Sequence, residues 1–275
     1  MRVSPGRTVF RIGRIVALAY VGLVAVLFVF QRGYIYYPRR TSFEDAERRA
    51  ARDRLQPWRA ADGRLIGWRT APADERILVF HGNAGSAVDR AYFAWAFAQR
   101  PGGRDWQVCI LEYPGYGPRE GRPSESALVG AGLKALDALL AEADRPVVLL
   151  GESLGSGVAA RVAAERPEHV AGLLFLTPFP SLADVAAAHY PYVPVRWLLR
   201  DRYDAAKALR AYNGPLVVVV AENDRVVPAR LGRRLLEGYA GPKRLFVQEG
   251  RDHNTLDLDP NSTWWSEAVE FLRGQ

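Results

Sequence analysis

The chain has 275 residues, of which 49% are hydrophobic, 24% charged and 11% aromatic. This composition excludes a disordered segment, a collagen-like repeat and a disulfide-stapled small protein, because it supplies enough apolar side chains for a core. The net charge of +7 is unevenly distributed: residues 1–60 carry +8, and the remainder carries −1. A nearly neutral body offers no basic face to a phosphate backbone, so no nucleic acid partner is expected.

An uncharged apolar run occupies residues 15–31, between Arg14 and Arg32. A helix of this length spans about 26 Å, and flanking arginines reach toward lipid headgroups, so the run predicts a transmembrane helix. Three tyrosines follow it, as in an interfacial aromatic belt: Tyr34, Tyr36 and Tyr37. The alternative is a cleaved signal peptide, but the run ends in Phe-Val-Phe-Gln instead of small residues. We therefore expect residues 1–40 to be an uncleaved, single-pass anchor in the lipid bilayer.

The arginines on the two sides of this anchor are nearly balanced in number. Acidic residues dilute the second group, and large trailing domains translocate largely regardless of charge. The body is therefore expected to lie outside the cytoplasm.

Residues 41–275 are expected to form one α/β domain. A charged helical connector at 43–54 precedes a hairpin at 57–70, whose turn contains Asp62-Gly63, a dipeptide that favours positive φ angles. Short β-branched runs then alternate with helical stretches, which predicts a mostly parallel, doubly wound sheet. The predicted strands are 77–80, 108–111, 147–150, 173–176, 216–220 and 245–247, and the predicted helices are 86–99, 125–143, 154–165, 228–239 and 262–272. Residues 178–213, which are rich in proline and aromatic side chains, interrupt the alternation and are expected to fold as a short helical cap.

The pentapeptide Gly151-Glu152-Ser153-Leu154-Gly155 lies between a predicted strand and a predicted helix. A nucleophile elbow needs this arrangement, because a sharp turn lifts the serine hydroxyl above the sheet and flanking glycines avoid steric collision. Together with His81-Gly82-Asn83-Ala84-Gly85, the motif resembles the α/β-hydrolase family. More closely, the chain is similar to membrane-anchored members that have this HGNAG loop. These members share two further segments with this chain. The first is Tyr113-Pro114-Gly115-Tyr116-Gly117, which has proline at its second position where relatives more often have arginine. The second is Asp224-Arg225-Val226-Val227-Pro228.

A serine nucleophile needs an adjacent base, usually histidine, and a carboxylate that orients the base. His253 follows the last predicted strand, where the resemblance, which covers about residues 55–272, implies the base. Asp224 follows the predicted strand 216–220 and is the expected acid, with Glu222 and Asp252 as nearby rivals. The predicted catalytic residues are Ser153, Asp224 and His253.

The tetrahedral intermediate of acyl transfer needs two hydrogen-bond donors for its oxyanion. The backbone N–H of Leu154 supplies one, because it lies at a predicted helix N-terminus directly after the serine. The resemblance implies that the backbone N–H of Asn83 supplies the other.

These residues predict a membrane-anchored serine hydrolase that cleaves acyl esters or thioesters of small-molecule or lipid-like substrates. A serine peptidase of the prolyl-oligopeptidase type and a hydrolase-like scaffold without turnover are the alternatives. No cofactor and no metal is expected, because the chain has neither a Walker lysine nor zinc-ligand spacing, and Gly151, Gly155 and Gly157 lack dinucleotide-binding spacing. The single Cys109 is expected to be a buried strand thiol.

Overall fold

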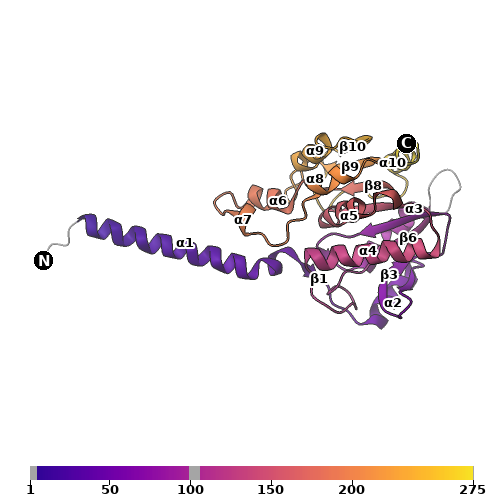
Figure 1. Ribbon diagram of the computed structural model, residues 1–275, viewed down its shortest axis with the longest axis horizontal. Helices are drawn as coiled ribbons and strands as arrows, with labels where there is room; N and C mark the ends of the chain where they lie inside the picture. The colour runs from indigo at the N-terminus through magenta and orange to yellow at the C-terminus, as the bar shows by residue number, and fades with distance from the viewer. Residues whose placement is uncertain (1–4, 99–105, 275) are drawn as a thin grey trace.

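The computed structural model describes residues 5–98 and 106–274 (Figure 1). A long helix, α1, extends away from an α/β body (Figure 1). Within the described residues, the body contains one eight-stranded sheet and a separate pair of short strands. The predicted mostly parallel, doubly wound sheet is confirmed.

The large sheet has the strand order β10-β9-β8-β7-β4-β6-β3-β2, in which β3 is antiparallel to both of its neighbours and all other pairs are parallel. Its strands are β2 (Gln56–Arg59), β3 (Leu65–Arg69), β4 (Glu75–Phe80), β6 (Trp106–Leu111), β7 (Val147–Glu152), β8 (Val170–Leu176), β9 (Leu216–Ala221) and β10 (Lys243–Gln248). The separate pair is β1 (Tyr37–Pro38) and β5 (Ala84–Gly85), which are parallel. Each predicted strand falls within one of the observed strands.

Helices of the body lie on both faces of the sheet and create two separate hydrophobic cores. The helices are α2 (Phe43–Arg52), α3 (Tyr92–Ala98), α4 (Glu125–Glu142), α5 (Leu154–Glu165), α6 (Leu182–His189), α7 (Val195–Leu198), α8 (Ala205–Ala208), α9 (Ala229–Glu237) and α10 (Thr263–Arg273), with short 3-10 turns η1 (Ala87–Arg90), η2 (Pro167–His169) and η3 (Leu209–Ala211). Side chains of α4, α5 and α9 pack on one face, and those of α2, α3 and α10 pack on the other. Cys109 is buried in β6, as predicted, and burial raises the pKa of its thiol to about 12.

Helix α1 covers Pro5–Ile35 and is longer than the predicted run 15–31. The prediction counted uncharged residues, whereas arginine is a good helix former and does not interrupt the backbone hydrogen bonds. Among the described residues, α1 provides the one segment that is long and apolar enough to cross a membrane, Val9–Ile35. By length and composition, this segment fits either an anchor or a signal sequence.

Two predicted elements differ in detail from the structure. The hairpin forms, but only Gly63 of its turn has a positive φ, because the chain reverses over a longer loop closed by Ala60 and Arg64. The predicted helix 86–99 is divided into η1 and α3, and its last residue lies outside the described part of the chain. The predicted cap region contains α6, α7, α8 and η3, and α6 and α7 lie beside the body-side half of α1 (Figure 1).

Candidate active site

Ser153 lies in the sharp turn that joins β7 to α5. Its φ of 50° and ψ of −114° place a non-glycine residue in a strained backbone region. The strain is held by two hydrogen bonds: the Ser153 N–H donates to Leu176 O at 2.8 Å, and the Ser156 hydroxyl donates to Ser153 O at 2.6 Å. This is the geometry of a nucleophile elbow, in which a serine side chain is lifted away from the sheet.

The glycines that flank Ser153 are required by close backbone contacts. A Cβ atom on Gly151 would lie 2.5 Å from the Cα of Ser156, and one on Gly155 would lie 1.9 Å from the carbonyl oxygen of Phe80. Neither backbone atom has room to move, because both belong to buried elements. The predicted reason for glycine at these two positions is confirmed.

His253 and Asp224 are brought together from two loops beyond the ends of β10 and β9. The imidazole Nδ1 lies 2.7 Å from Asp224 Oδ2, and the aspartate side chain is fully buried. Asp224 Oδ1 accepts hydrogen bonds from the backbone N–H groups of Val226 and Val227, at 2.8 and 2.6 Å. A carboxylate held in this way fixes the proton on Nδ1 and leaves Nε2 of the imidazole as a proton acceptor.

The two rival acids bind backbone groups instead of the imidazole. Glu222 accepts a hydrogen bond from the N–H of Gly250 at 2.9 Å. Asp252 accepts one from the backbone N–H of His253 at 2.5 Å, so its carboxylate stabilises the loop. The structure therefore pairs Asp224, and neither rival, with the ring of His253.

Asn83 is held by three hydrogen bonds in the loop that follows β4. Its carbonyl oxygen accepts from Tyr116 Oη at 2.7 Å and from the N–H of Tyr37 at 2.9 Å, and its side-chain amide donates to Ile35 O at 2.9 Å. In the described part of the chain, these contacts leave the N–H of Asn83 without an acceptor. The N–H of Leu154, at the start of α5, has no intrahelical acceptor either. Both residues line the same cavity as Ser153.

His81 is the first residue of this loop, directly after β4, and its side chain is fully buried. Its Nδ1 donates to Gly82 O at 2.8 Å, and its ring packs against those of Tyr113 and Tyr116. Burial, reinforced by the nearby charge of Arg90, lowers the pKa of His81 to about 3, so the ring is neutral. The Tyr113 hydroxyl also donates to His81 O at 3.0 Å. The two tyrosines of the Tyr-x-Gly-Tyr-Gly segment thus fix the loop, a role that the sequence analysis did not assign.

A largely buried ion pair connects this loop to the nucleophile elbow. Arg90 binds the Glu152 carboxylate through two hydrogen bonds of 2.7 and 3.0 Å. Burial alone would raise the pKa of Glu152, but the charge and hydrogen bonds of Arg90 outweigh it, and the pKa is lowered. The guanidinium also lies against Gly82 and Gly85. Sequence reasoning missed this pair; its one signal was an acidic residue directly before the serine.

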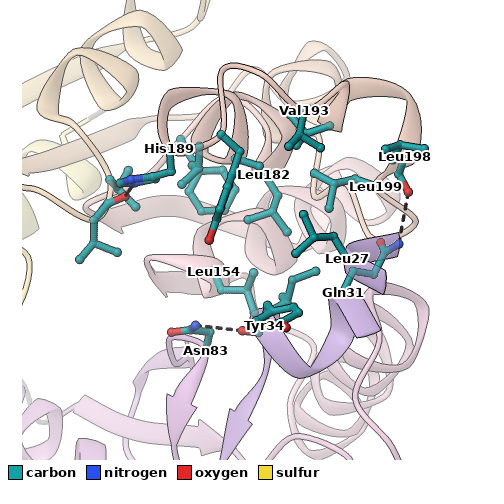
Figure 2. A pocket seen from close by; sticks show the side chains of 18 of the residues that line it. Leu27, Gln31, Tyr34, Asn83, Leu154, Leu182, His189, Val193, Leu198 and Leu199 are labelled. Carbon is teal, nitrogen blue, oxygen red and sulfur yellow. Dashed lines mark hydrogen bonds between the residues drawn. The ribbon is translucent and has the colours of Figure 1, made fainter. Parts of the chain in front are cut away.

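A cavity of about 260 Å³ opens above Ser153, Leu154 and Asn83. Its remaining walls are mostly apolar and come from α6, α7, the acid loop and, unexpectedly, α1. Figure 2 shows Leu27 and Gln31 of α1 beside Leu198 and Leu199, with a hydrogen bond between Gln31 and Leu198. The sequence analysis treated the apolar helix and the α/β domain as separate units, whereas the structure makes the end of α1 a wall of the cavity.

Polar contacts lock α1 to the cap. Arg32 binds Asp201 through two hydrogen bonds of 2.9 and 3.2 Å, and Asp201 also accepts from the Tyr36 hydroxyl at 3.1 Å. Gln31 Oε1 accepts from the N–H of Arg200 at 2.8 Å, while its amide group donates to Leu198 O (Figure 2). These contacts fix the last turns of α1 relative to the cavity.

Residues 5–98 and 106–274 contain no group of three or more His, Cys, Asp or Glu side chains arranged to hold a metal ion. Ser153, Leu154 and Asn83 line the base of the cavity, and the loop that contributes Val226 and Val227 to its wall also carries Asp224, the partner of His253. Such a set suits acyl transfer, in which serine attacks a carbonyl and the N–H groups stabilise the oxyanion.

Comparisons with known proteins agree with this geometry. A family model described as alpha/beta hydrolase fold matches residues 75–208. An uncharacterized protein of Mycobacterium tuberculosis is 35% identical over 252 residues, covering 89% of this chain and 88% of that protein. The esterase Pf2001 of Pyrococcus furiosus, at 16% identity, superposes with a TM-score of 0.60 over 87% of this chain and 97% of that chain, a likeness that shows the fold. The chain belongs to the alpha/beta hydrolase fold family.

One relative carries a named activity. The lysophosphatidylserine lipase ABHD12 of Mus musculus is 30% identical over 210 residues. The alignment covers 69% of this chain and 52% of that protein, so the chain spans about half the length of this relative.

Proposed function

We propose that this protein is a membrane-anchored serine hydrolase that cleaves acyl esters or thioesters. The observation that carries the proposal is the strained elbow of Ser153, which lines an apolar cavity together with two backbone N–H donors. The pairing of His253 with Asp224 supports it, because a scaffold that only binds a partner needs no such pair.

In the proposed reaction, Nε2 of His253 takes the proton of Ser153 as the hydroxyl oxygen attacks the acyl carbonyl. Asp224 stabilises the imidazolium that forms, and the N–H groups of Asn83 and Leu154 donate to the oxyanion. His253 then protonates the leaving alcohol or thiol, which departs from the acyl-enzyme. Water, activated by the same histidine, releases the carboxylic acid and restores Ser153.

The proposed substrate carries an acyl chain. The cavity wall is formed mainly by leucine, valine and aromatic side chains, and burying each methylene stabilises binding by about 0.8 kcal/mol. The lipase named among the relatives supports the same substrate class. A screen of p-nitrophenyl esters of graded chain length, then thioesters, lysophospholipids and peptides, separates an acyl hydrolase from a peptidase.

The anchor is proposed to remain attached to the body. Cleavage after the apolar run would remove Leu27, Phe28 and Gln31, which line the cavity. The catalytic body is proposed to lie outside the cytoplasm. A C-terminal alkaline phosphatase fusion should then be active, and an inactive fusion together with an active cytoplasmic reporter would contradict this orientation.

Labelling of membranes with a fluorophosphonate probe tests the catalytic proposal directly. The wild-type protein is expected to be labelled, and Ser153→Ala is expected to abolish labelling, because the probe reacts with an activated serine. Ser126→Ala is a matched control, since Ser126 lies on α4 and its hydroxyl contacts Ser124 instead of the elbow. An unlabelled wild-type protein would favour a non-catalytic scaffold.

A further inference from the structure

The segment 190–199, which we call the cap tip, exposes an apolar surface. It contains no acidic residue and a single arginine. Tyr190, Tyr192 and Trp197 are 53%, 88% and 85% exposed. Large aromatic side chains gathered on one exposed segment usually mark a surface that contacts a partner or a membrane.

The cap tip lies along the apolar part of α1. The hydroxyl of Tyr20 donates to Tyr192 O at 2.6 Å, and Gln31 bonds to the other end of the tip at Leu198. Nearby, the guanidinium of Arg200 stacks on the ring of Phe28 at 4.3 Å. Figure 1 shows α6 and α7 beside the same half of the helix. The residues of α1 between these contacts span about 16 Å along its axis.

A bilayer around α1 therefore reaches the cap tip as well. Both contact residues, Tyr20 and Gln31, lie within the apolar run 15–31, which is the part of the helix that fits the hydrocarbon core. Tyrosine and tryptophan side chains are favoured at the boundary between hydrocarbon and headgroups. The one arginine of the tip, Arg196, is paired with Asp184 at 2.7 Å, so its charge is compensated.

The cavity lies between α1 and the cap tip. Val193, Leu198 and Leu199 of the cap tip lie opposite Leu27 of α1 across it (Figure 2). We propose that the cap tip is a membrane-contact surface whose partner is the lipid bilayer. The acyl chain of the substrate then passes sideways from the bilayer into the cavity, between α1 and the cap. The entry of an acyl chain rests on the proposed function. The contact of the cap tip with lipid does not, because it depends only on how the cap tip lies along α1.

Depth-dependent quenching tests the contact in the full-length protein, reconstituted in nanodiscs of phosphatidylcholine and phosphatidylglycerol. Tyr192→Cys, labelled with an environment-sensitive fluorophore, is expected to be quenched by doxyl-labelled lipids. The native thiol of Cys109 is buried and does not compete for the label. Asp144→Cys is the matched control, because the Asp144 side chain is 89% exposed and follows the end of α4 that lies away from α1 (Figure 1). Quenching of the Tyr192 label by aqueous iodide but not by lipid would overturn the proposal.

Kinetics test the entry of substrate from the bilayer. The double variant Tyr192→Ser/Trp197→Ser is expected to lower kcat/KM on the order of tenfold for a long-chain ester embedded in the nanodisc. Hydrolysis of a water-soluble butyrate ester should stay within about twofold of wild type, because the catalytic residues are untouched. Trp95→Ser, which removes a half-exposed indole from α3, should change neither rate. An equal loss on both esters, or no loss on the embedded one, would contradict entry from the bilayer.

The two proposals fail in different ways. A wild-type protein that neither reacts with fluorophosphonate nor hydrolyses any ester would overturn the proposed function, while the quenching experiment still decides whether the cap tip contacts lipid. A labelled, active enzyme whose Tyr192 probe is shielded from both lipid and iodide would indicate a protein partner on the cap tip and overturn the membrane contact.

Discussion

The base of the cavity and its outer wall are built in different ways. At the base, Ser153, Leu154 and Asn83 lie in short loops at the ends of parallel strands, fixed by buried hydrogen bonds and a strained backbone. The outer wall consists of helices α1, α6 and α7, which meet through apolar side chains and a few polar contacts. The base is therefore held by short polar contacts, whereas the outer wall depends mainly on the packing of helices that lie far apart in the sequence.

The ion pairs of the two regions show the same contrast. Arg90 and Glu152, beneath the base, have side chains that are 15% and 21% exposed. In the outer wall, the side chain of Arg32 is 49% exposed, although its partner Asp201 is buried. The inner pair is shielded from water and from salt, so we expect it to contribute more to stability than the outer pair.

The largest effect is expected at the base, from Asp224→Asn. Because Oδ1 accepts two backbone N–H groups, the amide nitrogen of asparagine would face Nδ1 of His253 and force the wrong tautomer. Turnover of a p-nitrophenyl ester should fall by about 10⁴-fold. Glu222→Gln and Asp252→Asn are the matched controls and should stay within about tenfold of wild type. A large loss in either control, with Asp224→Asn active, would move the acid to that residue.

The next largest effect is expected from Arg90→Met. This change leaves the Glu152 carboxylate buried without its partner, which should lower the free energy of unfolding by about 3–5 kcal/mol. Thermal unfolding of the full chain in detergent micelles measures the loss. The double variant Arg90→Met/Glu152→Gln should recover part of it, since no buried charge remains. A double variant less stable than Arg90→Met would show that the pair is not the cause.

Glu112 is fully buried beside the loop that contains Asn83. We expect its titration to change the free energy of unfolding by about 3 kcal/mol. Burial raises the pKa of its carboxyl from 4.5 to about 7, although the Ala87 N–H and the Trp68 indole donate to it. Between these pH values the folded state keeps a proton that the unfolded state releases. The contribution of Glu112 to stability is thus present below about pH 4.5 and is lost as the pH rises through about 7.

Glu112→Gln removes this titration. The stability of wild type relative to the variant should therefore fall between about pH 5 and about pH 8, as measured by thermal unfolding at each pH. Glu120→Gln, which alters an exposed carboxylate near the same loop, is the control and should show no such trend. A difference between wild type and Glu112→Gln that is constant with pH would show that Glu112 does not titrate in this range.

The smallest effect is expected in the outer wall, from Leu27→Trp. A larger side chain on α1 takes up part of the 260 Å³ cavity and should shorten the preferred acyl chain. We expect a loss on the order of tenfold in kcat/KM for long esters, with butyrate hydrolysis nearly unchanged. Leu23→Trp places the same side chain on an exposed position of α1 and should leave the chain-length profile as it is. Identical profiles for the two variants would exclude α1 from substrate selection.

Much of the fold followed from local patterns in the sequence. Apolar runs such as 147–150 and 216–220 predicted buried parallel strands, because both faces of such strands are covered by helices. The Gly-x-Ser-x-Gly pentapeptide predicted the elbow, although only Gly151 is required by a contact within the strand-turn-helix unit, because Gly155 packs against Phe80 of β4. Asp224 was the expected acid, but Glu222 and Asp252 stayed as rivals, because distance along the sequence does not reveal which carboxylate meets the imidazole.

The sequence by itself determined the apolar helix and the order of strands and helices along the chain, because each depends on neighbours within a few residues. It also identified the elbow by its pentapeptide, although one of the two glycines is required by a contact with β4. Only the tertiary structure decided that Asp224 meets His253, that Tyr116 and Ile35 hold Asn83, and that α1 forms a wall of the cavity. These contacts join segments far apart in the chain, and they are set by how the helices pack on the twisted sheet.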